Sequence, residues 1–438
     1  MSNAESTVTK RRSWGEALAV YLEPRQLIIL VMGFASGLPL LLTLSTLSYW
    51  LKKEGTDLTT IGLFGAAGTP YAFKFVWSPA IDQVDLPLLG RLGRRKSWLF
   101  LIQLCLAAAI FALGFTDPAA NPYDTALAVV VLAFFSASQD IVIDAYRIEI
   151  LTAEEQAAGA ATTQVGYRIG LLLAGAGAVA LSDFVSWTVV FGVLAACILA
   201  AAVFTLFVPE PQVERPVVAD YRARLDEGLV QPFVEFAQRR GWIVVLLFVL
   251  LYKFGDAFGG FLANPFYIDM GFSGVEIAAF TKIYGILATV VGGVAGGAVV
   301  ARIGLFRTLM IGGVLQALSN LLFSVLALKG HDLLWLGIAI TGDNLAGGVA
   351  AAAFVAYLSG LCNRAFTATQ YALLTSFMAQ GRTLMSTPSG WLAKHLDWPE
   401  FWASTAVMAI PGLLLLVWLM RLYPDESHLT SAPAAART

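Results

Sequence analysis

Charge is scarce in this sequence. Only 13% of the 438 residues are Asp, Glu, Lys or Arg, and 58% are hydrophobic, whereas about 25% charged residues are usual in a soluble domain. The charge is about half of what a water-facing surface needs, which excludes a single soluble core and a disordered chain. A formal net charge of −2 also excludes a globally basic surface for nucleic acid.

Cysteine and histidine are rare as well. They are scattered along the chain at Cys105, Cys197, Cys362, His331, His395 and His428. Because no Cys-x-x-Cys pair or Cys/His cluster occurs, we expect neither a disulfide framework nor a metal site. No Walker-type phosphate loop is present, so ATP-driven transport is not encoded here and no cofactor is expected. The loops are too short for a catalytic domain, which argues against an enzyme.

Long apolar runs are abundant instead. A helix that crosses a bilayer needs about 20 apolar residues, and mean hydropathy over the chain is +0.73. Twelve runs qualify: 27–51, 59–81, 97–116, 124–147, 157–181, 187–208, 242–268, 275–300, 308–328, 333–360, 367–393 and 399–421. Strands of a membrane barrel would be shorter and strictly alternating. The predicted fold class is therefore an all-α membrane protein with 12 transmembrane helices.

The longest polar interval divides the runs into two groups of six. The predicted segments are an N-terminal segment (1–26), an N-terminal six-helix lobe (27–208), a linker (209–241), a C-terminal six-helix lobe (242–421) and a tail (422–438). Within the linker, residues 217–240 are predicted to form an amphipathic helix at the membrane interface. Residues 424–438 are polar and rich in Ala and Pro, and we expect them to be disordered.

The basic residues predict the orientation. Nineteen of the 28 Lys and Arg residues lie in the even-numbered loops and the two termini, four lie in the opposite loops, and five lie within the runs. Positively charged loops stay in the cytoplasm. Both termini are therefore predicted to be cytoplasmic.

The two halves repeat each other. GRLGRRKSWL (90–99) follows the second run and ARIGLFRTLM (301–310) follows the eighth, and Ala145-Tyr146 matches Ala356-Tyr357 in register. A parallel repeat of six-helix halves is typical of a two-lobed alternating-access transporter. In this register the charges of the first copy at Asp140, Asp144 and Arg147 become Ala351, Val355 and Leu358. The two halves therefore share a scaffold, but the charged residues at these positions occur only in the first half.

Several strings resemble known families. Asp82 and the basic turn of Arg91, Arg94, Arg95 and Lys96 resemble the loop motif of the major facilitator superfamily, with DLPLL interrupting the usual spacing. GLPLLLTLSTLSYWL (37–51), GTPYAFKFVWSPAID (68–82), SQDIVIDAYRIEIL (138–151) and QAAGAATTQVGYRIG (156–170) are similar to the AmpG muropeptide permeases.

That resemblance implies an importer in the bacterial inner membrane. Its substrates would be GlcNAc-1,6-anhydro-MurNAc and the peptide-bearing forms of this disaccharide. Uptake would be driven by the proton gradient and would serve peptidoglycan recycling and, in some bacteria, β-lactamase induction. Muropeptide, protons and the lipid bilayer are the expected partners of a monomer.

Charged groups inside the runs are the functional candidates, because burying them in lipid is expensive. We predict proton coupling for Asp140, Asp144 and Asp256. For Asp140 the alternatives are a fixed pair with Arg168 or direct substrate contact. Asp144 would alternatively pair with Arg94 or Arg95 to hold a gate closed. Asp256 and Lys253 form an i, i+3 pair near mid-membrane, which either serves the cavity or only neutralises itself.

Other polar residues are candidates for substrate binding. Lys74 and Arg168 would bind carboxylates, although either side chain could instead snorkel to the interface, as Lys282 could. The other predicted contacts are Tyr71, Gln139, Tyr167, Tyr252, Asp343, Asn344, Gln380 and Arg382. For these the alternatives are hydrogen bonds between helices and, for the tyrosines, anchoring at the interface.

The predicted gating residues are Asp82, Arg91, Arg94, Arg95, Lys96 and Arg147. On the first run, Gly33, Gly37 and Pro39 predict a bend or a site of close helix packing.

Other functions are also compatible with these features. The main alternative is another proton-coupled transporter of the superfamily, with an anionic substrate such as an acetyl-CoA-like molecule, a peptide or a drug. A membrane-embedded glycan enzyme would need large loops, and the two-fold repeat argues against a channel.

Overall fold

The computed structural model describes residues 15, 19–43, 45–56, 64–87, 89–213, 230–273, 276–277, 279–386 and 388–423. These residues form helices and connecting turns, with no strand among them. Within this part of the chain, ten helical segments are long and apolar enough to cross a membrane. Because a bilayer offers the backbone no hydrogen-bond partner, long apolar runs must form helices that satisfy their own amides. The predicted all-α class is confirmed.

The first six predicted spans correspond to a series of helices, several of them segmented. They are α2 (Pro24–Gly37), η2 (Leu40–Thr43) and α3 (Ser45–Lys53); η3 (Gly65–Gly68), α5 (Thr69–Phe73), η4 (Lys74–Val76) and α6 (Ser78–Gln83); α7 (Arg94–Leu113); α8 (Pro122–Ile150); α9 (Gln156–Leu172), the π-helix η6 (Leu173–Gly177) and α10 (Ala178–Leu181); and α11 (Trp187–Phe207).

The second six spans follow the short helix α13 (Gln231–Ala237). They are α14 (Trp242–Leu251) and α15 (Phe254–Asp269); the π-helix η7 (Ala279–Tyr284) and α17 (Gly285–Ile303); α18 (Leu305–Lys329); α19 (Leu333–Gly360); α20 (Thr367–Ser386) and α21 (Ser389–His395); and α22 (Trp398–Met408) and α23 (Ile410–Leu422).

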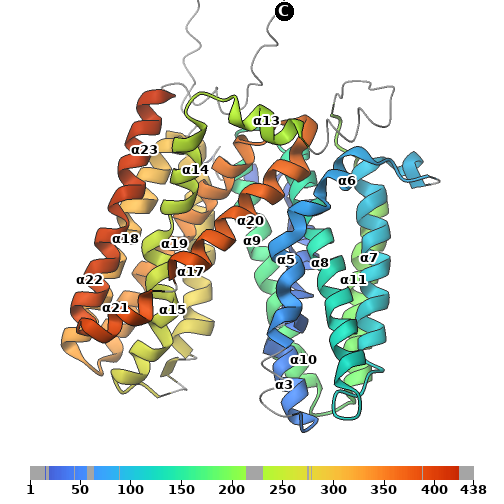
Figure 1. Cartoon of the computed structure of the whole chain (residues 1–438), viewed down its shortest axis with the longest axis horizontal. Helices are drawn as coiled ribbons and strands as arrows, with labels where there is room; N and C mark the ends of the chain where they lie inside the picture. Colours follow the sequence, from blue (N-terminus) through green and yellow to red (C-terminus); the bar gives the residue numbers. More distant parts are fainter. Residues whose placement is uncertain are drawn as a thin grey trace, which may run out of the picture.

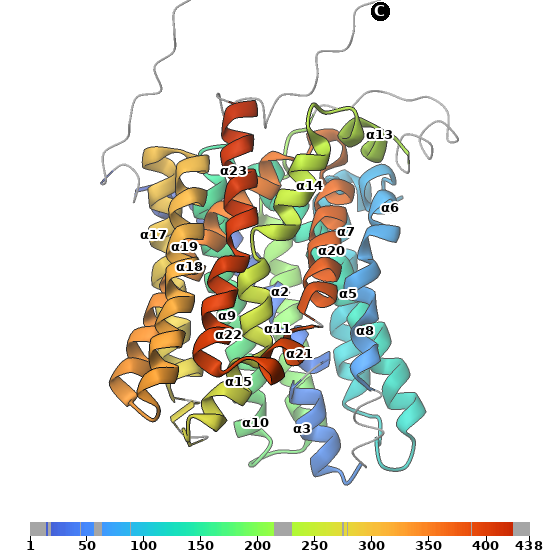
Figure 2. The same cartoon turned by 60° about the vertical axis from the view of Figure 1, so that its left-hand side comes forward.

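The two groups of helices stand side by side as two lobes (Figure 1). Helices α3 to α11 lie on one side and α14 to α23 on the other, and a second view shows the same bundle from a different side (Figure 2). Helix α13 lies at the end of the molecule where α6 and α23 end. It falls within the predicted amphipathic helix, of which residues 217–229 lie outside the described residues, as does the tail 424–438.

Prolines divide the spans predicted over 59–81 and 367–393 into shorter helices. In the span predicted over 59–81, Pro70 and Pro79 each stand in the first turn of a new segment, α5 and α6, because proline fits a helix start and disrupts a helix interior. Residues 59–63 of this span lie outside the described residues. Pro388 likewise separates α20 from α21.

Glycines allow α2 and α9 to meet backbone to backbone. A Cβ atom added at Gly37 would lie 2.8 Å from the Cα atom of Tyr167, and one at Gly170 would lie 2.7 Å from the amide nitrogen of Leu38. Gly33 faces Thr163 in the same way. The predicted close packing is therefore confirmed, and α2 ends at Gly37 before η2 begins.

The repeated turns share one conformation. Gly93 precedes α7 with φ 98° and ψ 159°, and Gly304 precedes α18 with φ 91° and ψ 165°. A positive φ of this size favours glycine, since a Cβ atom would be strained there. The structure thus supports the internal repeat that the two basic strings predict.

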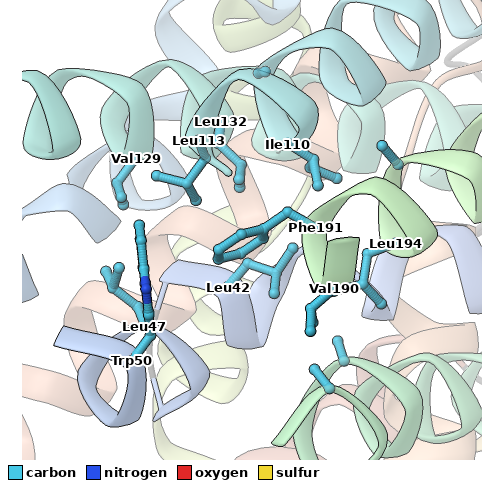
Figure 3. Close-up of a cluster of buried hydrophobic side chains, with 14 of the residues drawn as sticks. Leu42, Leu47, Trp50, Ile110, Leu113, Val129, Leu132, Val190, Phe191 and Leu194 are labelled. Carbon is cyan, nitrogen blue, oxygen red and sulfur yellow. The ribbon is translucent and has the colours of Figure 1, made fainter. Parts of the chain in front are cut away.

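Apolar side chains fill the interior of each lobe. In the N-terminal lobe, Trp50 packs edge-on against Phe191 with ring centroids 5.0 Å apart, among leucines and valines from α7, α8 and α11 (Figure 3). In the C-terminal lobe, Phe248, Tyr252, Phe354 and Tyr357 form a continuous aromatic cluster. Each lobe can therefore move as a packed unit.

The glycine contacts between α2 and α9 generate a stability prediction. In Gly166→Ala the new methyl group would meet the amide nitrogen of Phe34 at 2.8 Å and the carbonyl carbon of Leu30 at 3.0 Å. We expect a loss of about 1–3 kcal/mol from overpacking, seen as a lower melting temperature of the detergent-purified protein. Gly390→Ala is the control, because a methyl group at Gly390 would enter open space. Equal melting temperatures for the two variants would contradict close packing at Gly166.

Candidate functional site

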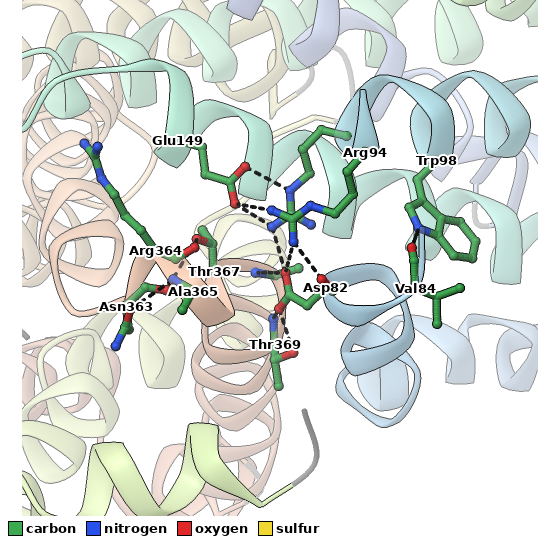
Figure 4. A network of polar contacts seen from close by, with 12 residues as sticks. Asp82, Val84, Arg94, Trp98, Glu149, Asn363, Arg364, Ala365, Thr367 and Thr369 are labelled. Carbon is green, nitrogen blue, oxygen red and sulfur yellow. Dashed lines mark hydrogen bonds and ion pairs between the residues drawn. The ribbon is translucent and has the colours of Figure 1, made fainter. Parts of the chain in front are cut away.

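A buried ionic cluster lies at one end of the molecule (Figure 4). Arg95 Nη2 donates to Asp82 Oδ1 at 2.7 Å and to Glu149 Oε1 at 2.5 Å, and Arg95 Nε donates to Glu149 Oε2 at 3.0 Å. Arg94 joins with Nη1 donating to the Asp82 carbonyl at 2.7 Å and Nη2 lying 3.4 Å from Glu149. Two carboxylates and two guanidinium groups thus balance each other, as buried charges require.

The same cluster reaches across to the other lobe. Asp82 accepts hydrogen bonds from the backbone amides of Thr369 and Ala368 at 2.7 and 3.3 Å, and from the Thr369 hydroxyl at 2.7 Å. These amides belong to the first turn of α20, where free N–H groups and the helix dipole favour a negative charge. Asp82 therefore joins α6 of one lobe to α20 of the other; we call this contact, with Arg94, Arg95, Glu149 and Thr369, the Asp82 clamp.

The structure places the predicted gating residues in different surroundings. Asp82, Arg94 and Arg95 form the clamp. Arg147 lies beside it, buried, with its guanidinium group 5.4 Å from the ring centroid of Tyr371 on α20. Arg91 is exposed. Gating remains a prediction for all six.

Lys96 serves a contact within the N-terminal lobe, because its Nζ donates to the Leu206 carbonyl on α11 at 3.0 Å. The backbone amides of Arg95 and Lys96 donate to Glu210, which follows α11. Burial raises the pKa of Glu210 although these two hydrogen bonds oppose the shift.

One predicted ion pair is wrong. Asp144 does not pair with Arg94 or Arg95; it lies 3.8 Å from Arg147, and Glu149 takes the position opposite the two arginines. Asp140, Asp144 and Arg147 share a helical face, whereas Glu149 points elsewhere on the last turn of α8. The sequence offers one signal for Glu149: it is an acidic residue at the end of an apolar helix, on the same side of the membrane as a basic turn.

A cavity of about 340 Å³, with several polar side chains in its walls, lies mainly in the C-terminal lobe. Its walls include Asp256 on α15, Asp343 and Asn344 on α19 and, from α9 of the other lobe, Arg168. Asp343 accepts from Gln316 Nε2 at 2.7 Å, and Asn344 accepts from the Thr289 hydroxyl at 2.7 Å. Lys253 and Asp256 pair at 3.0 Å as their spacing predicts. Three predicted binding residues, Arg168, Asp343 and Asn344, are thus brought together.

Other predicted binding residues lie away from this cavity. Tyr252 is packed in the aromatic cluster, and its hydroxyl donates to the Leu309 carbonyl at 2.8 Å. Gln139 is fully buried and donates to the Ala35 carbonyl on α2. Substrate binding stays a prediction for both. Gln380 and Arg382 are exposed and do not line the cavity.

A second group of polar residues lies in the N-terminal lobe. Asp140 accepts from the Ser36 hydroxyl at 2.6 Å, and Tyr71 donates to the Ser136 hydroxyl at 2.7 Å. Lys74 is close enough to act electrostatically on both Asp140 and Asp144, and Asp140 acts likewise on Tyr167. Within the described residues Asp140 forms no ion pair with Arg168, so the predicted fixed pair is replaced by a serine contact.

No three His, Cys, Asp or Glu side chains of the described residues form a possible metal site. The side chain of Lys282 lies outside the described part of the chain.

Two packed lobes, a clamp that joins them at one end and a cavity at their boundary define a two-lobed membrane transporter. Residues 27–342 match the family model of the Major Facilitator Superfamily. The chain is 41% identical over 402 residues to the anhydromuropeptide permease of Escherichia coli (strain K12), with 91% of this chain and 80% of that protein covered. It is 36% identical over 403 residues to the putative transporter AmpG 4 of Rickettsia conorii, with 91% and 97% covered. The chain therefore belongs to the Major Facilitator Superfamily and, within it, to the AmpG permeases.

A solved structure shows the same fold. The Major Facilitator Superfamily transporter FucP in the outward conformation matches with a TM-score of 0.68 at 12% identity, covering 91% of this chain and 99% of that chain. At this identity the likeness concerns the fold alone.

The clamp generates the next prediction. Asp82→Asn removes the carboxylate that Arg95 shares with the first turn of α20, and breaking a buried pair costs about 3–5 kcal/mol. We expect the clamped end to open. Spin labels are attached at Arg91→Cys and Arg364→Cys, two exposed positions on opposite lobes, after the native cysteines have been replaced by serine. The distance between the two labels should increase. Glu54→Gln, which alters an exposed carboxylate, is the control and leaves the distances unchanged. Unchanged distances in Asp82→Asn would show that the clamp does not hold the lobes.

Proposed function

We propose that this multi-pass membrane protein imports GlcNAc-1,6-anhydro-MurNAc and its peptide-bearing forms from the periplasm to the cytoplasm. The observation that carries the proposal is the 41% identity to an anhydromuropeptide permease over 91% of the chain. The location would be the bacterial inner membrane, the acting unit a monomer, and the role peptidoglycan recycling, with β-lactamase induction as a consequence in bacteria that sense its products.

Alternating access is supported by the clamp and the cavity. The clamp closes the end that the basic residues assign to the cytoplasm, which is the arrangement that accepts substrate from the periplasm. Opening then requires Asp82 to leave the first turn of α20. The cavity lies where the lobes meet, which is where transporters of this architecture bind substrate.

Proton coupling is proposed for the acids of the cavity and of the N-terminal lobe. A proton carrier must change its proton affinity between the two states, and burial next to a cation that can move away does this. Asp140 lies beside Ser36 and within the electrostatic reach of Lys74. Asp144 lies near Lys74 and Arg147. Asp256 is held by Lys253. Asp140 is our first candidate, because its neighbour Ser36 is neutral and Lys74 belongs to a short, separate segment, η4.

Uptake into vesicles tests the function itself. Inverted or right-side-out membrane vesicles that contain the protein are given labelled GlcNAc-1,6-anhydro-MurNAc, with and without a protonophore. We expect accumulation against the concentration gradient in right-side-out vesicles and its loss when the protonophore dissipates the proton gradient. Vesicles without the protein are the control. Uptake at the level of those vesicles would refute the proposal, and accumulation that resists the protonophore would refute proton coupling.

The Asp140→Asn variant tests the proton carrier. An amide at this position can still accept from Ser36 but cannot release a proton. We therefore expect a loss of uphill accumulation of at least about tenfold, with exchange of labelled for unlabelled substrate retained. Asp117→Asn in an exposed turn serves as the matched control. Normal uphill transport by Asp140→Asn would assign the proton to another acid.

A further inference from the structure

Three buried polar atoms on the C-terminal wall of the cavity have no hydrogen-bond partner among the described residues. They are Gln316 Oε1, Asn320 Nδ2 and Trp402 Nε1, on side chains of residues that are only 7%, 3% and 3% exposed. Leaving a buried polar group unpaired costs free energy, so native proteins pair nearly all of them. Three such atoms around one cavity indicate a bound molecule that supplies the missing partners.

These side chains are fixed in place before any ligand arrives. The Gln316 amide nitrogen donates to Asp343, and the Trp402 ring stacks on Phe323 with centroids 4.6 Å apart. Gly259 gives the indole room, because a Cβ atom there would lie 2.6 Å from the ring. When the polar groups of a site are already held in place by neighbouring residues, ligand binding does not lose free energy in ordering them.

The charge of this wall selects the kind of group that fits. Asp343 and Asp256 lie on this wall, and the cation Lys253 is already paired with Asp256, so the wall offers a carboxylate no free cation. The indole N–H and the Asn320 amide match carbonyl or hydroxyl oxygens, and the Gln316 oxygen matches an N–H or O–H. The only cation from the opposite wall is Arg168, whose buried Nε also has no partner within the described chain.

We propose that this C-terminal wall is a subsite for an uncharged N-acylated sugar ring, bound through Gln316, Asn320 and Trp402. The acidic group of the same ligand then points across the lobe boundary to Arg168. The cavity volume of about 340 Å³ is at the lower end of the range for small-molecule sites, about 300–1,000 Å³. The assignment rests on the proposed function and specifies which end of the substrate each lobe holds.

Binding to the purified full-length protein tests the orientation. Two probes are used, the disaccharide GlcNAc-1,6-anhydro-MurNAc and its neutral analogue in which the lactyl carboxylate is a primary amide. Trp402→Phe keeps the aromatic stack and removes only the indole N–H. We expect it to weaken both probes by the same factor, about 3- to 10-fold, the usual value of one hydrogen bond. Arg168→Gln should weaken the acid and leave the amide unchanged.

Matched variants keep the test decisive. Trp418→Phe changes a tryptophan of α23 that is 56% exposed and should leave both affinities unchanged. Asn320→Leu is the second probe of the same wall, in case Trp402→Phe fails to fold, and should act as Trp402→Phe does. Wild-type affinities in both folded variants would overturn the subsite while the proposed function stands.

Two other outcomes are informative. If a sugar-free stem peptide competes with the disaccharide, and Asp343→Asn abolishes that competition, then the wall binds an ammonium group and the subsite is overturned. If the wild-type protein binds neither probe, the proposed function fails together with the subsite.

Discussion

A hydrocarbon medium supplies no hydrogen bonds, so every polar group within this protein must find its partner in the protein or in a ligand. The helices satisfy the backbone. Asp82 is satisfied by two arginines and by the first turn of α20, and Lys253 is satisfied by Asp256. The same constraint gives meaning to Gln316, Asn320 and Trp402, which line the cavity and are among the buried side chains with an unpaired polar atom within the described residues.

The two lobes share a scaffold and differ in chemistry. The repeated turns at Gly93 and Gly304 have the same backbone conformation, yet the N-terminal lobe holds Asp140 and Lys74 where the matching register of the C-terminal lobe has lost its charges. In the C-terminal lobe the cavity wall is built from amides, an indole and a self-paired Lys253–Asp256. A duplicated scaffold can therefore place charged groups in one lobe and groups that bind the neutral part of a ligand in the other, on either side of the boundary between the lobes.

Much of this arrangement could be predicted from sequence, because lipid makes hydropathy and helix periodicity dominate. The twelve spans, the Lys253–Asp256 pair and the close packing at Gly33 and Gly37 all follow from local spacing. What could not be predicted depended on rotation about a helix axis or on a break within a helix. Glu149, not Asp144, faces the arginines from the last turn of α8, and Tyr252 packs in the aromatic cluster at the end of α14. Neither feature has a local sequence signal that distinguishes the residue from its neighbours.

Two of the three hydrogen bonds that join α20 to Asp82 come from main-chain amides, and this affects how the protein can vary. Ala368 contributes its backbone amide, and Thr369 contributes an amide as well as a hydroxyl. Any residue other than proline supplies an amide, so the two main-chain hydrogen bonds survive any substitution at Ala368 or Thr369 that fits their buried surroundings. The acidic side of the clamp has no such freedom, because only a short carboxylate at position 82 can meet Arg95 and the helix end together. We therefore expect position 82 to tolerate fewer substitutions than positions 368 and 369.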